Sequence, residues 1–337
     1  MVIEMSKKTK IAFAVVIIIA IVIAAAVIVI QKSDRNSKAV ETDGTLMDNS
    51  YQNITYEGKN YVYNSKATAI LYAGLDSAGD IETYNRYTIA PRADTIEVFI
   101  LDDYHKTIKI LAVSRDTIAE ISRYTMNGTY RDEYMSQIGY AFAFGDGGKV
   151  SCNNLKSAVS NLLGGIPVKE HVITNTDTLK DINRTAGGVT VTVPNNDLAA
   201  SYPELAEGRT VTLDDSNVDA FVRYRDTDAE FSNNGRMERQ RAFSESFMKA
   251  FKESVSNDAE GTWSKIEEIK ENMLTSITRS QYLDLADKIA EADFPADNYY
   301  TIEGEDIRGE ETDEFHVDKE KLQKLIIDLF YIEDGEA

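Results

Sequence analysis

Arginines are concentrated in one stretch of this sequence, residues 221–241. Five residues of the stretch are arginines, and none is a lysine: Arg223, Arg225, Arg236, Arg239 and Arg241. Lysine would solvate a surface equally well, whereas the guanidinium group presents five donors in a flat fork that matches phosphate or carboxylate oxygens two at a time. The composition therefore indicates an anion-binding site. The alternative is a set of surface ion pairs with the neighbouring aspartates and glutamates.

The first two arginines of the stretch are expected on one face of a strand. Arg223 and Arg225 are two residues apart in an apolar and aromatic run, Phe221 to Arg225. Such a run predicts a strand, and residues two apart in a strand leave the same face.

The later arginines are expected at the start of a helix. Residues 232–235, Ser-Asn-Asn-Gly, are typical of a helix amino terminus. Arg236, Arg239 and Gln240 follow at positions i, i+3 and i+4, so their side chains should share one face of the first turns. The amino end of a helix also favours anions, which strengthens the case for a bound phosphate or carboxylate.

Acidic residues are predicted at the ends of three strands further upstream. The apolar run 67–75 predicts a buried strand that ends at Asp76. Asp94 leads into a second strand, 95–101, and a return strand, 107–113, ends just before Arg115 and Asp116. If Asp76 and Asp94 converge, they form an all-oxygen site suited to Mg²⁺, completed by phosphate oxygens. Each acid taken singly is more typical of a solvated turn residue.

The remaining chain alternates between helical and extended patterns. A helix with a glycine break, which lacks the Ser or Thr of a phosphate loop, is predicted over 137–165. The other predicted elements are helices at 176–186, 242–255, about 262–274, about 280–291 and 318–329, and strands at 189–193 and 298–302. This alternation predicts an α/β fold, an α-β-α sandwich around a central mixed sheet.

A membrane anchor is predicted to precede this fold. Residues 11–30 contain no polar side chain, and twenty helical residues span a bilayer core of about 30 Å. Three lysines precede the span, so the positive-inside rule places residues 1–10 in the cytoplasm. The small residues that could serve as a cleavage site lie inside the span, which favours an uncleaved anchor. Residues 31–59 are predicted to be an extracellular linker and 60–337 an extracellular catalytic domain.

Charge and cysteine content exclude some partners. The formal net charge is −20, and residues 31–337 carry −22 because the first 30 residues contribute +2. Such a surface would repel nucleic acid. The single cysteine, Cys152, excludes an internal disulfide and fits a Gram-positive envelope. The three histidines are scattered and no CxxC or HExxH motif occurs, which argues against zinc.

Taken together, the motifs resemble the LytR-CpsA-Psr family of Gram-positive envelope enzymes. The resemblance covers residues 67–335 in a consistent order. It rests on Gly74-Leu75-Asp76, Arg92-Ala93-Asp94-Thr95, Ser114-Arg115-Asp116-Thr117, the run from Tyr140 to Gly145, the run from Leu162 to Pro167, the run from Gly187 to Pro194, Phe221-Val222-Arg223-Tyr224-Arg225 and the run from Gly235 to Gln240.

The resemblance implies the chemistry and the residues that carry it. It implies transfer of a glycopolymer, such as teichoic acid or capsular polysaccharide, from a polyprenyl pyrophosphate carrier to peptidoglycan through a phosphodiester. It implies that Asp76 and Asp94 hold Mg²⁺, with Mn²⁺ as an alternative. The residues implied to bind the pyrophosphate are Arg92, Arg115, Arg223, Arg225, Arg236 and Gln240. The predicted catalytic residues are Asp94, Arg115, Asp116 and Arg225.

Several points stay open at this stage. Asp116 is a candidate for the base that activates the acceptor hydroxyl, and orienting Arg115 is its alternative role. The family usually has serine at the position of Ala93 and an arginine shortly after that of Asp76. A polyprenyl pyrophosphate phosphohydrolase and a non-catalytic envelope or regulatory protein are the competing functions. The expected location is the cell membrane, crossed once with the amino terminus inside.

Overall fold

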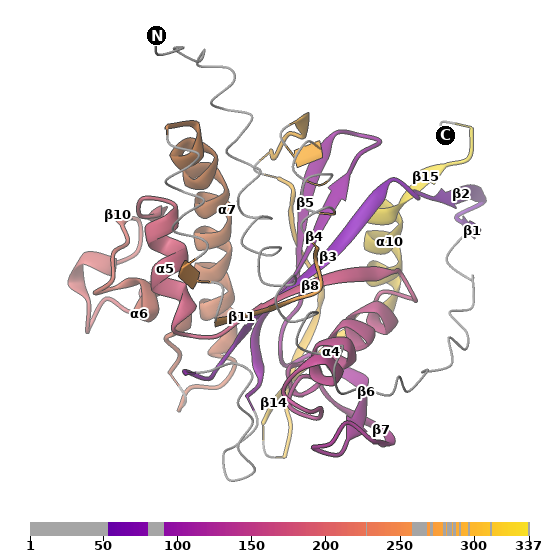
Figure 1. The fold of residues 1–337 in the computed structure, drawn as a ribbon, viewed down its shortest axis with the longest axis horizontal. Coiled ribbons are helices and arrows are strands. Elements are labelled where there is room, and N and C mark those ends of the chain that lie inside the picture. The colour runs from indigo at the N-terminus through magenta and orange to yellow at the C-terminus, as the bar shows by residue number, and fades with distance from the viewer. Residues whose placement is uncertain are drawn as a thin grey trace.

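The structure is a computed structural model of the 337-residue chain. It describes residues 53–79, 91–226 and 228–257, and residues 268–335 with several short gaps. Within these residues, a mixed sheet separates two layers of helices (Figure 1).

The central sheet has six strands in the order β11-β8-β3-β4-β5-β12. β3 pairs in parallel with β8 and β5 with β12, and the other neighbours are antiparallel, which confirms the predicted mixed sheet. The strands are β3 (Ala67–Leu75), β4 (Ala93–Asp102), β5 (Thr107–Ala112), β8 (Val168–Thr174), β11 (Met273–Thr275) and β12 (Tyr299–Thr301).

Helices cover both faces of this sheet, as predicted (Figure 1). One layer consists of α5 (Thr178–Thr185), α6 (Val218–Arg223) and α7 (Asn233–Asn257). The other consists of α4 (Lys149–Leu162) and α10 (Lys319–Phe330). Short 3₁₀ helices occur at η2 (Ile138–Tyr140) and η3 (Pro203–Leu205).

Side-chain alternation along the strands creates two separate cores. In β4, Ile96, Val98 and Ile100 belong to the core beneath α4 and α10. Because successive side chains of a strand leave opposite faces, Glu97 and Phe99 lie on the side of α7. The face beneath α5, α6 and α7 therefore contains a carboxyl group among apolar residues.

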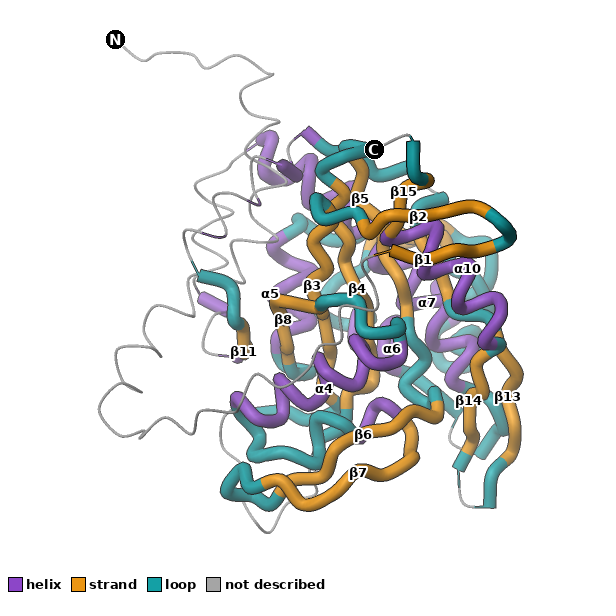
Figure 2. Tube along the Cα trace, turned by 90° about the vertical axis from the view of Figure 1, so that its right-hand side faces the viewer, coloured by secondary structure: helices purple, strands orange, loops and turns teal. Residues whose placement is uncertain are grey.

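Four smaller β units surround the sandwich (Figure 2). β1 (Asn53–Tyr56), β2 (Lys59–Tyr63) and β15 (Tyr331–Glu333) form one sheet, so strand pairing begins inside the segment predicted as a linker. β9 (Thr190–Thr192) pairs with β10 (Thr210–Thr212). Two hairpins are β6–β7 (Ile118–Tyr124 and Tyr130–Gln137) and β13–β14 (Gly304–Arg308 and Asp313–Val317).

The predicted strand around Arg223 is wrong. Residues 218–223 form α6, and Arg223 is its last residue. The apolar side chains Val218, Phe221 and Val222 are buried against the α5–α7 core. The spacing of three and four residues between these side chains is that of a helix, whereas the strand prediction rested on the short apolar run 221–225.

Two further predictions need correction. Residues 138–140 form only a 3₁₀ turn after β7, so the predicted helix over 137–165 begins at Lys149. Residues 273–275, placed at the end of a predicted helix, form the edge strand β11 beside β8. In this short segment, the hydrogen bonds gained by pairing with β8 outweighed the preference of the local sequence for a helix.

The predicted membrane anchor, residues 11–30, lies outside the described residues. Among the residues that the structure does describe, no helix combines the length and the hydropathy needed to cross a bilayer.

Candidate active site

The first part of the site forms where β3 ends beside the start of β4. The pairing of these strands shifts register at Gly74 and Leu75, and the chain then turns at Asp76. Asp76 Oδ1 accepts a hydrogen bond from the Arg92 backbone N–H at 2.8 Å, and Arg92 Nε lies 3.5 Å from Asp76 Oδ2. The Arg92 guanidinium also lies over the Tyr140 ring and donates to its hydroxyl at 3.1 Å. These contacts fix the orientation of both charged groups.

Asp94 lies between two arginines at the centre of the site. Arg236 Nη1 donates to Oδ2 of Asp94 at 2.6 Å, and Arg115 Nη1 donates to Oδ1. Burial alone would raise the pKa of Asp94, but Arg236 and Arg115 outweigh burial and hold this pKa below its usual value. Asp94 is therefore a stable carboxylate near neutral pH.

The two arginines beside Asp94 are almost completely buried. Arg236 is 2 % exposed and Arg115 is 6 % exposed. Burial lowers the pKa of Arg236 to about 10, which leaves the side chain charged at neutral pH. Its Nε atom is buried and has no hydrogen-bond acceptor among the described residues. Such a donor is costly to leave unsatisfied, and an added oxygen ligand would satisfy it.

Asp116 adjoins this cluster from the next strand end. Its Oδ1 atom accepts a hydrogen bond from Gln137 Nε2 at 2.9 Å and lies 3.4 Å from Arg115 Nε. Burial raises the pKa of Asp116, although the nearby arginines oppose the rise. A raised pKa brings a carboxylate closer to the range in which it can accept a proton, so both proposed roles of Asp116 fit its position.

Arg223 and Arg225 supply positive charge without fixed partners. Neither makes a hydrogen bond or an ion pair with any residue in the described part of the chain. Arg223 lines the same pocket as Asp94. Burial lowers the pKa of Arg225, and the charge of Arg115 lowers it further, which places Arg225 within electrostatic reach of the cluster. Both side chains are thus available for an anion.

Arg239 holds the segment that carries these two arginines. It is fully buried, and its Nε donates to the Phe221 carbonyl at 2.9 Å. Its Nη2 donates to the Tyr224 carbonyl, and its Nη1 to Asn195 and Asp197. The predicted helix start is confirmed, and Arg236 and Gln240 line the polar pocket, whereas Arg239 binds backbone on both sides of Arg223. The spacing from Arg236 identified Arg239 in the sequence as a residue of interest. The sequence did not show which groups Arg239 would bond.

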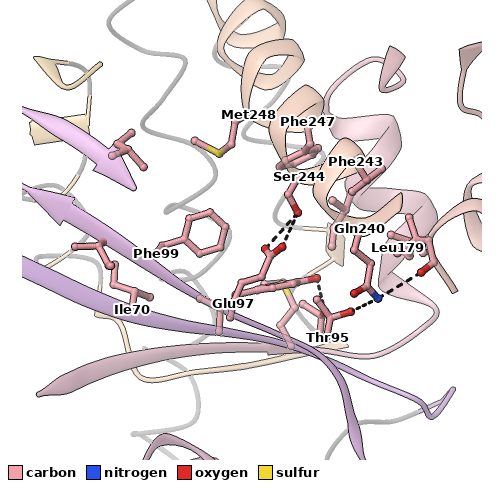
Figure 3. Close-up of a pocket in the computed structure, with 18 of the residues that line it drawn as sticks. Ile70, Thr95, Glu97, Phe99, Leu179, Gln240, Phe243, Ser244, Phe247 and Met248 are labelled. Carbon is pink, nitrogen blue, oxygen red and sulfur yellow. Dashed lines mark hydrogen bonds between the residues drawn. The ribbon is translucent and has the colours of Figure 1, made fainter. Parts of the chain in front are cut away.

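Gln240 marks the boundary between a polar pocket and an apolar cavity. Its Nε2 donates to Thr95 Oγ1 at 2.9 Å (Figure 3). The polar pocket, of about 40 Å³, is lined by Asp76, Asp94, Arg223 and Arg236 among others. The cavity, of about 140 Å³, adjoins it between the sheet and α7. Six residues line both spaces: Tyr72, Thr95, Thr174, Leu179, Val222 and Gln240.

The cavity is lined almost entirely by hydrocarbon. Figure 3 shows Phe99 on β4 and Phe247 and Met248 on α7 around the same space. A polar pocket that shares a wall with such a cavity suits an amphiphile with an anionic head and an apolar tail.

Among the described residues that line the cavity, Glu97 is the one with a carboxyl group. It is 2 % exposed and points toward α7, where Ser244 Oγ donates to its two oxygens at 3.0 and 3.2 Å (Figure 3). Tyr299 Oη donates to Oε1 at 2.8 Å. Burial raises the pKa of Glu97 to about 7. Sequence inspection missed this group, because Glu97 lies in a strand pattern that is typical of an exposed position.

The predicted metal ligands share one pocket. Asp76 and Asp94 both line the polar pocket, and each carboxylate is bonded to arginine in this structure. The described residues contain no group of three or more His, Cys, Asp and Glu placed to hold a metal. Two carboxylates are nevertheless a suitable donor set for Mg²⁺, which keeps several waters and takes phosphate oxygens from its substrate. The residues therefore fit a metal that binds together with a phosphorylated ligand.

The family assignment agrees with this geometry. The model of the LytR_cpsA_psr family matches residues 28–329. The chain belongs to the LytR-CpsA-Psr family.

Characterised members of the family give the comparison more detail. The chain is 27 % identical over 226 residues to a Bacillus mycoides protein named polyisoprenyl-teichoic acid–peptidoglycan teichoic acid transferase TagU, covering 66 % of this chain and 65 % of that protein. The protein of the same name from Halalkalibacterium halodurans is 32 % identical over 185 residues, which cover 54 % of this chain and 52 % of the relative. The matched region is thus just under two thirds of the length of the first relative and about half of the length of the second.

Solved structures of the LytR-CpsA-Psr type share the fold. Protein gbs0355 from Streptococcus agalactiae has a TM-score of 0.61 at 21 % identity, covering 78 % of this chain and 88 % of that one. B. subtilis TagV has a TM-score of 0.53 at 24 % identity, covering 78 % and 96 %. A structure of TagT bound to LI-WTA has a TM-score of 0.56 at 19 % identity, covering 84 % and 96 %.

The buried carboxyl of Glu97 predicts a pH-dependent stability. Its pKa is about 7 in the folded chain against 4.5 as the ordinary value, so the folded state holds its proton more tightly than the unfolded state. Ionisation of the buried Glu97 therefore lowers the free energy of unfolding. This loss of stability is absent below pH 4.5, grows as the pH rises to 7, and then stays constant at about 3 kcal/mol. Glu97→Gln removes the titration and keeps an acceptor for Tyr299 and Ser244.

We expect the free energy of unfolding of Glu97→Gln to exceed that of the wild type progressively from pH 5 to pH 7. Denaturant unfolding at pH 5, 6, 7 and 8 measures this difference. A difference that does not change with pH would contradict the prediction.

Proposed function

We propose that this protein transfers a secondary cell-wall glycopolymer from a polyprenyl pyrophosphate carrier to peptidoglycan. The observation that carries the proposal is that the arginine-rich pocket adjoins the apolar cavity and shares six lining residues with it. An anionic head group bound among the arginines would place an attached isoprenoid chain in the cavity. The names of the TagU relatives support teichoic acid as the class of polymer.

The proposed reaction is one phosphoryl transfer. A hydroxyl oxygen of peptidoglycan forms a bond to the phosphorus that carries the glycopolymer. The bond from that phosphorus to the bridging oxygen of the pyrophosphate breaks, and polyprenyl phosphate leaves. The hydroxyl proton passes to a base, for which Asp116 is the proposed residue. The products are a phosphodiester and a lipid monophosphate, and no oxidant or further substrate is required.

The arginines are proposed to stabilise charge during the transfer. Arg223 and Arg225, which lack fixed partners in the described structure, would bind the pyrophosphate oxygens, and Arg92, Arg115, Arg236 and Gln240 would complete the binding site. Preorganised donors of this kind stabilise a phosphoryl transfer without covalent participation. Asp94 keeps Arg115 and Arg236 oriented before the substrate arrives.

Asp76 and Asp94 are proposed to hold Mg²⁺ or Mn²⁺ when the pyrophosphate is bound. A divalent cation at this place would neutralise negative charge on the phosphate oxygens. Without substrate, the charge of Asp94 is balanced by its two arginines, so metal affinity is expected to depend on the phosphorylated ligand.

The protein is further proposed to act at the outer face of the cell membrane. Residues 11–30 would cross the membrane once, with residues 1–10 inside and a linker from residue 31 connecting the anchor to the extracellular catalytic domain. This arrangement would keep the domain beside its lipid-linked donor.

Arg225→Ala should remove most of the transferase activity. Loss of one charge-assisted contact to the pyrophosphate is expected to cost about 2 to 4 kcal/mol of transition-state stabilisation. Arg225→Lys should restore little, because an ammonium group lacks the two-donor fork. The measurements are kcat/KM with lipid-linked polymer and peptidoglycan oligomers, and binding of polyprenyl phosphate. Arg236→Ala should lose activity too, with a loss of stability because Asp94 loses a partner.

Arg241→Ala is the matched control. Arg241 lies on α7 outside both pockets and pairs with Glu245 at 2.9 Å on the surface. Its loss should change stability by less than about 1 kcal/mol and leave activity unchanged. Equal and mild effects at positions 225, 236 and 241 would argue against a pyrophosphate site. Release of free phosphate with no linked product would indicate a phosphohydrolase instead.

Asp76→Asn should weaken the dependence of activity on Mg²⁺ while the fold is kept. Asp76 is partly exposed and supports the Arg92 backbone through Oδ1, which an asparagine side-chain oxygen can also do. The readouts are the Mg²⁺ concentration for half-maximal activity and binding of Mg²⁺ in the presence of inorganic pyrophosphate. Asp94→Asn should weaken both as well. If both variants keep the wild-type metal response, the metal ligands lie elsewhere.

Protease added to intact protoplasts should digest the chain from about residue 31 onward. The expectation follows from the apolar run 11–30 and the three lysines before it. Immunodetection of an epitope tag at each terminus measures which part is accessible. Protection of the carboxyl-terminal tag would contradict the proposed topology.

A further inference from the structure

The β6–β7 hairpin presents an unusual open surface. The described residues include seven large apolar or aromatic side chains that are exposed, and four of them belong to this hairpin and its turn: Met126, Tyr130, Tyr134 and Met135. Contiguous exposed groups of this kind mark interaction sites more often than isolated ones do. Figures 1 and 2 show the hairpin beyond α4, at the edge of the molecule.

The strand register divides the hairpin into a covered and an open face. On the covered face, Ala119 and Ile121 are buried in the core shared with α4. Tyr134 pairs with Ile121 at the outer end of the covered face. The ring of Tyr134 lies under the Arg123 guanidinium. The open face is formed by the alternating pairs Glu120 with Met135, Ser122 with Glu133, and Tyr124 with Tyr130. These six residues are called the hairpin face below.

The hairpin face begins at the proposed active site. Gln137 pairs with Ile118, which is the next pair on the same face, and its amide donates to Asp116 Oδ1 at 2.9 Å. From Gln137 to Tyr130 the strand advances seven residues, or about 23 Å at about 3.3 Å per residue. Gln137 and Asp116 are themselves buried, at 6 % and 4 % exposed, and Gln137 also donates to the Asp313 carbonyl at 2.6 Å. The strand therefore connects the exposed pairs of the hairpin face to the residue proposed to activate the acceptor hydroxyl, over a length that suits several units of a polymer.

The chemistry of the hairpin face selects the kind of polymer. The rings of Tyr124 and Tyr130 lie edge to face with centroids 5.8 Å apart, and Glu120 and Glu133 flank them. Aromatic rings pack against the C–H faces of sugar rings, and carboxylates accept hydrogen bonds from sugar hydroxyls and amides. The paired positions of this face hold no lysine or arginine, and the exposed Arg131, which a register shift leaves unpaired, lies beside Tyr130. The face therefore carries charges of both signs and lacks the concentration of positive charge that a phosphate-rich polymer or an anionic lipid surface would need.

We propose that the hairpin face docks the acceptor, a glycan strand of peptidoglycan, and guides its hydroxyl toward Asp116. This inference rests on the proposed transferase function and adds the surface that recognises the acceptor. The donor would enter from the other side, through the arginine-rich pocket and the apolar cavity. The two substrates then meet at the strand ends that carry Asp94 and Asp116.

The test compares Tyr130→Ala with Tyr134→Ala in the full chain. The two tyrosines belong to the same strand and are similarly exposed, at 53 % and 49 %. A register shift between them pairs Tyr130 with Tyr124 of the hairpin face, whereas Tyr134 pairs with Ile121 of the covered face. Tyr130→Ala should raise the KM for soluble peptidoglycan oligomers about fivefold to tenfold, which corresponds to about 1 to 1.4 kcal/mol. Its kcat at saturating acceptor and its KM for the lipid-linked donor should stay unchanged. Tyr134→Ala should leave all three quantities unchanged.

Binding of the same peptidoglycan oligomers is also measured by calorimetry without any donor. Tyr130→Ala should weaken this binding by the same factor as the KM. Similar behaviour of the two variants, or a Tyr130→Ala effect confined to the donor KM, would overturn the proposed docking surface. A wild-type chain that binds the oligomers through Tyr130 but forms no linked product would support the surface and overturn the transferase function.

Discussion

The site depends on one carboxylate shared by two buried arginines. Asp94 bonds Arg115 with one oxygen and Arg236 with the other, and it joins three segments that are distant in the sequence. Two guanidinium groups could not be buried side by side without such a counter-charge, because desolvation and mutual repulsion would both oppose it. The carboxylate thus permits a concentration of positive charge at the strand ends. Asp94 does not neutralise all of this positive charge, since Arg223 and Arg225 add two guanidinium groups that form no ion pair with the described residues.

Rigid support surrounds this charged centre. Arg239 binds the backbone of α6 and of Tyr224, Gln240 joins α7 to Thr95, and Gln137 holds Asp116. Arg223 and Arg225, which are proposed to bind substrate, therefore lie on a segment whose backbone is held by Arg239. Such support lowers the cost of organising several cations around one anion, which is the main requirement of phosphoryl transfer.

The fold also separates the surfaces that two different substrates need. The apolar cavity lies between the sheet and α7, and the hairpin face lies beyond α4 on the other side of the sheet (Figure 1). Both lead to the same strand ends. A lipid-linked donor and a polymeric acceptor could then be bound at once without competing for space, and the cavity would shield the apolar part of the donor from water.

The sequence by itself determined the family, the mixed α/β architecture, and nearly all residues of the charged pocket, because strand ends, a helix start and arginine spacing are local signals. It did not determine that residues 218–223 are helical, that Arg239 bonds backbone, or that Glu97 faces an apolar cavity. Those outcomes depend on which elements pack together. The spacing of apolar residues along the chain indicates a helix or a strand, but it does not identify the element that packs against it. The strand register alone showed that Tyr130 pairs on the hairpin face and Tyr134 on the covered face, and that Gln137 connects the hairpin face to Asp116.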